Sequence, residues 1–269
     1  MARSTFYYHL KRLGNTSKYK EEKKRIKEIF QESKGRYGYR RITLQLRNDG
    51  YVINHKTVEK LMQDLGIKCL IRKKRYRSYK GTVGKIAPNI LNRDFKADCP
   101  YSKLATDVSQ ISIGQQKSFL SPIIDMFNGE ILSYNVSDRA DLEQINKMLK
   151  DVFAITDKAP AGNKILLHSD QGWQYQHAYY RNRLKEHGII QSMSRKGNCY
   201  DNCIMETFFG RIKTELYYGF EKDYTSFEEF AIAIDEYIDY YNSKRIQAKT
   251  KWMPPVKYSC LLYTSPSSR

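Results

Sequence analysis

The sequence has no long apolar run, few cysteines and no recognisable leader. Its 269 residues have a mean hydropathy of −0.68, and no stretch approaches the roughly 18 apolar residues of a membrane-spanning helix. The N-terminal stretch MARSTFYYHLKRL is basic but lacks the apolar segment of a secretory signal. Five cysteines form no disulfide framework, and Cys199 and Cys203 have no second ligand pair at zinc-site spacing. We therefore expect a cytoplasmic protein with no membrane partner.

Acidic residues are scarce in only one part of the chain. Residues 1–100 contain 26 Lys and Arg but only 9 Asp and Glu, whereas residues 101–269 contain 21 and 20. Nearly all of the formal net charge of +18 therefore lies in the first third. Such asymmetry is typical of a polyanion-binding module joined to a near-neutral domain. A basic surface that serves only solubility is the alternative that charge alone leaves open.

Three amphipathic helices are predicted in the basic third. The ranges 18–35, 37–50 and 55–66 repeat apolar residues at helical spacing, and each ends at a glycine. The short connection YVIN joins the last two, which predicts a basic, helix-turn-helix-like DNA-binding region over residues 1–77. The expected DNA contacts lie on these helices and in the block IRKKRYRSYKG: Arg40, Arg41, Lys56, Lys60, Arg72, Lys73, Lys74, Arg75 and Arg77.

The pattern changes after residues 78–100, whose glycines and prolines predict an interdomain linker. Strands are predicted at 104–113, 118–126, 129–137, 164–170 and 189–194, and helices at 141–156, 175–188, 198–219 and 226–244. This order predicts an α/β domain over residues 101–258, with a mixed sheet flanked by helices on both faces. The Ser- and Pro-rich residues 259–269 are expected to be a disordered or extraneous tail.

Three acidic residues occupy unusual positions in this scheme. Asp107 falls inside the first strand, Asp170 lies at the carboxyl end of the fourth, and Glu206 borders the apolar face of the 198–219 helix. Adjacent places for the two strands would bring the aspartates together, and the helix could add Glu206. Converging carboxylates need cations, and their hard oxygens suit Mg²⁺ or Mn²⁺. Two ions about 4 Å apart would assist phosphodiester chemistry.

The helix of Glu206 carries two further residues on the same stripe. We expect Gly210 to allow the close approach of a strand and Lys213 to contact a phosphate. Arg195 and Lys196, which border a glycine-containing loop, are further candidates for phosphate contact.

Other polar residues near the three acids have structural interpretations. Asp201, with Asn202, is expected to cap the helix of Glu206. Asp125 precedes a hairpin turn, which is an ordinary place for aspartate. His168 is interpreted as a satisfied residue at a strand end, because phosphodiester hydrolysis through two metal ions needs no protein base.

The motifs TDVSQ (106–110), HSDQGWQY (168–175) and SRKGNCYDNCIMETFFGRIKTEL (194–216) resemble those of the insertion-sequence transposases of the IS-three family. That family belongs to the superfamily that includes retroviral integrases, and its signature is Asp, Asp and, after 35 intervening residues, Glu. Here 35 residues separate Asp170 from Glu206. Residues 36–68 and 240–258 are also similar to segments of the family. The resemblance implies a ribonuclease-H-like catalytic domain in which Asp107, Asp170 and Glu206 bind metal and catalyse DNA cleavage and strand transfer.

The same resemblance implies cofactors and partners. We expect two Mg²⁺ ions per active site, with Mn²⁺ able to substitute, and DNA in the form of terminal inverted repeats and target. A homo-oligomer on DNA, association with the bacterial nucleoid, and an upstream-frame protein as fusion or partner are further expectations. Two other functions stay open: a structure-selective, ribonuclease-H-like nuclease, and a non-catalytic DNA-binding regulator.

Overall fold

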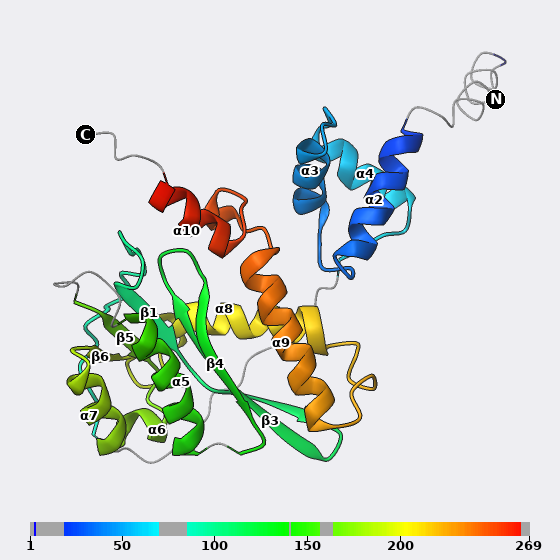
Figure 1. The fold of residues 1–269 in the computed structure, drawn as a ribbon. Coiled ribbons are helices and arrows are strands. Elements are labelled where there is room, and N and C mark those ends of the chain that lie inside the picture. Colours follow the sequence, from blue (N-terminus) through cyan, green and yellow to red (C-terminus); the bar gives the residue numbers. More distant parts are fainter. Residues whose placement is uncertain (1–2, 4–18, 70–84, 140, 157–163, 265–269) are drawn as a thin grey trace, which may run out of the picture. The chain divides into compact units, whose positions relative to one another are not determined.

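A computed structural model describes residues 3, 19–69, 85–139, 141–156 and 164–264 (Figure 1). The chain divides into two compact units, Met1–Arg72 and Lys73–Arg269, each of which is described by itself. Across the described ranges, no helix is both long enough and apolar enough to cross a membrane.

The first unit consists of helices α2 (Lys20–Glu32), α3 (Tyr39–Asn48) and α4 (His55–Asp64). Their apolar faces meet in a small core that includes Ile26, Ile42 and Val58. The glycines that were predicted to end these helices, at positions 35, 50 and 66, have positive φ angles, which glycine adopts readily. Asn54 caps α4, since its side chain accepts a hydrogen bond from the Lys56 N–H at 2.9 Å. The predicted helical unit is thus present.

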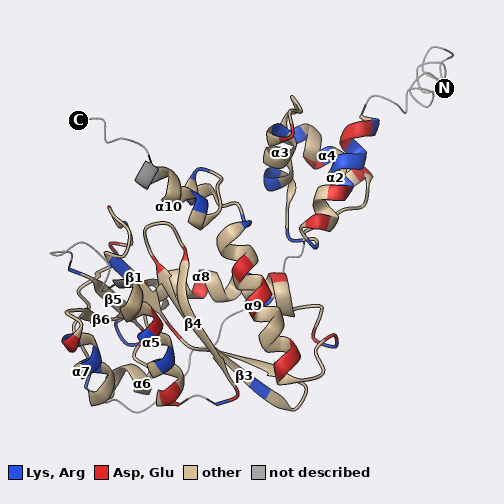
Figure 2. Cartoon of the chain, in the orientation of Figure 1, with Lys and Arg blue, Asp and Glu red and all other residues tan. Residues whose placement is uncertain are grey.

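The predicted DNA contacts of this unit differ in their surroundings. Arg40, Lys56 and Lys60 are exposed, and Figure 2 marks Lys and Arg positions along α2 and α3 in blue. Arg41 is half-buried, with its guanidinium carbon 5.5 Å from the centre of the Tyr37 ring. The remaining predicted contacts, Arg72, Lys73, Lys74, Arg75 and Arg77, lie outside the described residues.

The second unit is built on one mixed sheet. Its strands are β1 (Lys103–Thr106), β2 (Ser109–Ile113), β3 (Gln116–Asp125), β4 (Ile131–Ser137), β5 (Leu166–Ser169) and β6 (Ile190–Met193). β3 pairs antiparallel with β1, β2 and β4, whereas β5 lies parallel to β1, and β6 parallel to β5. The structure thus confirms the predicted mixed sheet.

The first predicted strand, 104–113, is broken at Asp107 and Val108. β1 and β2 continue one register along β3, which places Asp107 opposite Pro122. Met126 donates its N–H to Lys103, so every second residue back along β3, including Pro122, turns its backbone nitrogen towards this strand. Proline has no N–H, and the ladder therefore lacks a bond at this point. The prediction that Asp107 lies inside a continuous strand was wrong for this reason.

Helices cover both faces of the sheet. They are α5 (Leu142–Thr156), α6 (Trp173–Gln176), α7 (Ala178–Glu186), α8 (Cys203–Ile212), α9 (Phe227–Ser243) and α10 (Pro255–Thr264). Short turns of other helix types are η1 (Cys199–Asn202), η2 (Lys213–Tyr217) and η3 (Ala248–Thr250). Along β1, Leu104 packs with residues of α5 and α7, and Ala105 packs with residues of α8 and α9. This alternation shows two separate cores, one on each face.

Two predicted boundaries were wrong. The described part of the expected linker, residues 85–100, packs on the second unit: Leu91 is buried, and the N–H groups of Ile90 and Leu91 donate to Ser192 Oγ at 3.0 and 3.1 Å. At the other end, α10 reaches into the expected tail, and Ser259 Oγ accepts from Asn128 Nδ2 at 2.6 Å. Local composition did not reveal these tertiary contacts. Residues 265–269 lie outside the described ranges.

Candidate active site

Asp107 sits at the break between β1 and β2, where its backbone has left the ladder. Its Oδ1 accepts the N–H of Val108 at 2.7 Å, and its Oδ2 accepts Nδ2 of Asn202 at 2.9 Å. Asn202 is the residue directly before α8. The carboxylate is therefore held from its own strand and from the start of the helix that carries Glu206.

Asp170 follows β5 directly and lies beside Asp107. β1 and β5 are parallel neighbours with Ala105 opposite His168, and two residues further this register places Asp107 opposite Asp170. Neighbouring strands are about 4.8 Å apart, so the two side chains leave adjacent strand ends together. The Gly172 N–H donates to Asp170 Oδ1 at 2.8 Å and fixes the carboxylate. The predicted adjacency of the two strands is confirmed.

Glu206 occupies the first turn of α8 and is exposed. Its neighbours Met205 and Phe208 are buried in the core under the sheet, which anchors this turn of the helix. The carboxylate acts on Asp107 electrostatically and raises its pKa. Glu206 therefore belongs to the same field of negative charge as the two aspartates.

This concentration of carboxylates changes their acidity. Burial and the nearby Asp170 raise the pKa of Asp107 well above its usual range, against the opposing effect of the hydrogen bonds from Val108 and Asn202. Burial also raises the pKa of Asp170, and partial loss of hydration raises that of Glu206. Burial lowers the pKa of Lys213, and the charge of Asp107 partly offsets that effect, so this lysine lies within reach of the acids' field.

The donor set matches a hard divalent cation. Carboxylate oxygens are the ligands that Mg²⁺ and Mn²⁺ prefer, and a cation between Asp107 and Asp170 would relieve the repulsion that raises the pKa of Asp107. In the described ranges, no three or more His, Cys, Asp or Glu side chains are already gathered into a cluster that could hold a metal ion.

Two predictions around α8 were wrong. Gly210 was expected to allow a close approach, but a Cβ built there would meet nothing within 4 Å. Asp201 and Asn202 were expected to cap the helix, but Asn202 is the N-cap residue and makes no side-chain cap bond. Asn202 instead contacts Asp107, and the Asp201 carboxylate pairs with Arg93 and Arg195. These contacts come from distant segments, which helical periodicity does not register.

Four other polar residues were considered in the sequence analysis: Asp125, His168, Lys196 and Asn202. Asp125 is structural, since its two oxygens accept the N–H groups of Tyr101 and Phe127. His168 is buried, with Nδ1 2.9 Å from Ser192 Oγ, but its Nε2 is buried without a hydrogen-bond partner among the described residues. The prediction of a fully satisfied histidine was therefore wrong for Nε2. Lys196 is exposed. The sequence analysis gave Asn202 a capping role and no role at the aspartates. Its spacing of four residues from Glu206 was the available signal.

Comparison with known proteins agrees with this geometry. Residues 18–75 match the model of an HTH-like domain, and residues 97–199 and 206–260 match two models of the integrase core domain. The putative transposase InsK of insertion sequence element IS150 from Escherichia coli is 51% identical over 256 residues, which cover 95% of this chain and 89% of that protein. The chain belongs to the insertion-sequence transposases. A transposase-like protein of Haemophilus influenzae is 49% identical, over 81% of this transposase and 97% of its own length.

Solved structures support the fold of the transposase. A chain of the simian T-cell lymphotropic virus intasome, in complex with PP2A regulatory subunit B56 gamma, aligns with a TM-score of 0.50 and 15% identity, over 90% of this chain and 75% of that one. The predicted fold class, a ribonuclease-H-like mixed sheet preceded by a helix-turn-helix-like domain, is therefore confirmed. So is the predicted enzyme class, a DDE-type polynucleotidyl transferase. Integrase core domains use divalent metal ions.

The raised pKa of Asp107 predicts how the metal-free transposase responds to pH. An acid whose folded pKa lies above its unfolded value of about 3.9 destabilises the fold wherever it is ionised, so the cost is absent below that pH and grows as pH rises towards the folded pKa. In EDTA, we expect Asp107→Asn to increase the free energy of unfolding at pH 7.5, because it removes this electrostatic cost.

Urea unfolding followed by circular dichroism measures this effect at pH 7.5 and near pH 4, where the gain should shrink. Asp98→Asn, on an exposed carboxylate, is the control and should be neutral at both pH values. An equal gain for Asp107→Asn at the two pH values would contradict the electrostatic explanation.

Proposed function

We propose that Asp107, Asp170 and Glu206 are the catalytic residues of this transposase and that together they hold two Mg²⁺ ions, for which Mn²⁺ can substitute. The observation that carries the proposal is the register between β1 and β5, which sets Asp107 beside Asp170. The effect of Glu206 on the pKa of Asp107 supports including the third acid in this proposal. When bound there, the ions would activate an attacking oxygen and stabilise a leaving one.

The chain's own groups orient the acids. The Val108 N–H and Asn202 Nδ2 each donate to one oxygen of Asp107, and the Gly172 N–H donates to Asp170. These bonds limit rotation of the two carboxylates. Asn202 thereby links Asp107 to the start of α8, on which Glu206 is carried.

The reaction that this site supports is phosphoryl transfer in two stages. Water attacks a phosphodiester at an element end, its oxygen bonds to phosphorus, and the bond from phosphorus to the 3′ oxygen breaks. The freed 3′-hydroxyl then attacks a phosphodiester of a second strand. Its oxygen bonds to phosphorus, and the bond from that phosphorus to the second strand's 3′ oxygen breaks, which leaves a 3′-hydroxyl there. No side chain becomes bonded to DNA in either stage.

The partner is DNA, as terminal inverted repeats and as target. Exposed Arg40, Lys56 and Lys60 of the helix-turn-helix-like unit support contacts with phosphates. So do exposed Lys196 and half-buried Lys213, the latter within reach of the charge of Asp107. A homo-oligomer on DNA, an upstream-frame protein as fusion or partner, and a place in the bacterial cytoplasm and nucleoid are parts of the same proposal. Contacts from Arg72, Lys73, Lys74, Arg75 and Arg77 remain predictions.

An assay with end-labelled DNA and a supercoiled acceptor tests this function. In Mg²⁺, the protein should both cleave the labelled strand and join it to the acceptor, and EDTA should abolish both products. Cleavage without joining would contradict the strand-transfer step and favour a structure-selective nuclease. Binding that produces neither product, on DNA that carries the element's own ends, would favour the DNA-binding regulator.

A further inference from the structure

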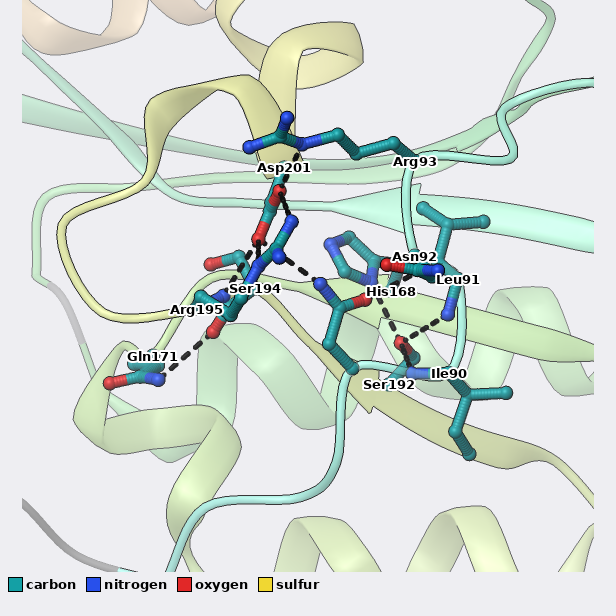
Figure 3. Close-up of polar contacts among 11 residues, drawn as sticks. Ile90, Leu91, Asn92, Arg93, His168, Gln171, Ser192, Ser194, Arg195 and Asp201 are labelled. Atoms are coloured by element: carbon teal, nitrogen blue, oxygen red, sulfur yellow. Dashed lines mark hydrogen bonds and ion pairs between the residues drawn. The ribbon is translucent and has the colours of Figure 1, made fainter.

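Asp201 is a fully buried carboxylate beside the candidate active site, and five donors surround it (Figure 3). Its Oδ1 accepts Arg93 Nε at 2.7 Å and Arg195 Nη2 at 2.8 Å. Its Oδ2 accepts Asn89 Nδ2 at 3.0 Å, Arg195 Nε at 2.7 Å and the Arg195 N–H at 3.1 Å. The Arg195 guanidinium, which is the main cause, holds the pKa of Asp201 well below its usual range. Asp201 is therefore a permanently charged anchor.

The donors come from two segments that are distant in the sequence. Arg195 precedes Asp201 by six residues, in the loop that leads from β6 to η1. Asn89 and Arg93 belong to the segment before β1, more than 100 residues earlier in the chain. Asp201 thus joins that segment to the loop across the end of the sheet.

The segment that supplies Asn89 and Arg93 is itself fixed to the sheet. Ser192 Oγ accepts the N–H groups of Ile90 and Leu91, and His168 Nδ1 lies 2.9 Å from the same oxygen (Figure 3). Ser192 is in β6, and His168 is in β5, two residues before Asp170. The anchor of Asp201 is therefore tied to the strand that ends at a catalytic carboxylate.

On its other side, Asp201 adjoins the catalytic groups. The next residue, Asn202, donates to Asp107, and Glu206 follows one helical turn later. The loop has a second tie, because Gln171 Nε2, next to Asp170, donates to the Ser194 carbonyl at 2.9 Å (Figure 3). A shift of Asp201 would therefore move Asn202 and the first turn of α8 relative to both aspartates.

Asn89, Arg93 and Asp201 lie outside the parts of the chain that match the integrase core models. Asn89 and Arg93 precede the match over residues 97–199, and Asp201 falls between it and the match over residues 206–260. Arg195, which was expected to contact phosphate, directs two of its side-chain donors to Asp201. Arg195 therefore holds Asp201 through contacts within the protein, which do not require DNA.

We propose that Asp201 is a positioning residue and that Arg93 and Arg195 clamp it, so that the segment before β1 sets the placement of Asn202 and Glu206 against Asp107. The inference rests on the proposed function and deepens it. It assigns part of the active site to residues 85–93, ahead of the integrase core match. Asp201 acts through Asn202 and α8 rather than by contact with the reacting phosphate.

Kinetics of the full chain test the clamp with three variants: Asp201→Asn, Arg93→Gln and the two combined. In Asp201→Asn, the amide NH₂ group would face the donors of Arg93 and Arg195, and Arg93→Gln would remove one ion pair of Asp201. Each single variant should therefore lower kcat about 10- to 100-fold, with KM for DNA changed much less. Because both residues act through one contact, the double variant should be no slower than the worse single variant. If the two losses of kcat multiply in the double variant, the proposed clamp is refuted.

Hydrogen exchange supplies a readout that does not depend on activity. Backbone amides of residues 195–206 should exchange faster in Arg93→Gln, while those of β1 and β5 stay protected. Arg183→Gln, which breaks a 2.7 Å ion pair with Glu186 on α7, is the matched control and should change neither kcat nor this exchange. Unchanged exchange and kcat in Arg93→Gln would refute the proposal.

Two further results separate this test from misfolding of a variant and from failure of the proposed function. If Asp201→Asn fails to fold, Arg93→Gln carries the experiment alone, because Arg93 is partly exposed and its loss leaves the arginine contacts of Asp201 with Arg195. If Glu206→Gln retains full activity, the proposed function fails. The exchange measurement would then still decide whether Arg93 fixes the loop.

Discussion

Replacing Asp107 by asparagine will reduce DNA cleavage and strand joining by at least about a thousandfold. Asp107 is the acid on which the charges of both Asp170 and Glu206 act, and it receives the Asn202 hydrogen bond. An amide oxygen carries no full charge, so the site would bind divalent ions more weakly and stabilise the developing charge less. Metal ions contribute several kcal/mol to such reactions, and about 4 kcal/mol corresponds to a factor of a thousand.

Single-turnover cleavage of end-labelled DNA at saturating protein measures this loss. Asp125→Asn is the matched control, because Asp125 is another buried aspartate with a raised pKa of about 6, due chiefly to burial. It accepts hydrogen bonds from the N–H groups of Tyr101 and Phe127 and has a structural role, so its variant should keep the chemical step. Full activity in Asp107→Asn would remove this acid from the mechanism.

Replacing Arg245 by methionine will destabilise the second unit by about 3–5 kcal/mol, the usual cost of leaving one partner of a buried ion pair alone. Arg245 is 1% exposed, and its Nη2 and Nε donate to the two oxygens of Glu215 at 2.6 and 3.0 Å. The Tyr237 hydroxyl donates to the same carboxylate at 3.0 Å. These bonds hold η2, at the end of the α8 region, to the end of α9.

Urea unfolding of the full chain measures this effect, and a surface ion pair provides its scale. Arg183→Gln should cost no more than about 1 kcal/mol, because exposed pairs contribute little. The double variant Arg245→Met with Glu215→Leu should recover much of the loss, since it leaves no buried charge unpaired. A loss in Arg245→Met as small as that in Arg183→Gln would show that the buried pair does not stabilise η2 against α9.

Local patterns in the sequence were sufficient for most of the fold. The apolar periodicity of the first three helices and the glycines after them predicted the helix-turn-helix-like unit. The run of strands and helices from residue 101 predicted the mixed sheet. Asp170 was assigned to a strand end on the same grounds, and β5 does end at Ser169. These features depend on neighbours within a few residues, which a single sequence contains.

The errors arose where a distant segment decides the local structure. The break at Asp107 depends on Pro122, which lies on another strand and lacks an N–H. Aspartate is a residue type that commonly caps helices, but Asp201 instead forms an ion pair with Arg93, which lies more than 100 residues away in the sequence. Glycines and prolines in 78–100 indicated a linker because nothing local shows that Leu91 is buried. Pairings of this kind become visible only with the tertiary structure.

The contact between Arg93 and Asp201 has a consequence for retargeting insertion with chimeric proteins. A fusion that exchanges the N-terminal unit at residue 97, where the integrase core match begins, would retain Asp107, Asp170 and Glu206 but discard Arg93, which pairs with Asp201. A join placed ahead of residue 85 would keep Arg93 in the same protein as Asp201, with which it pairs.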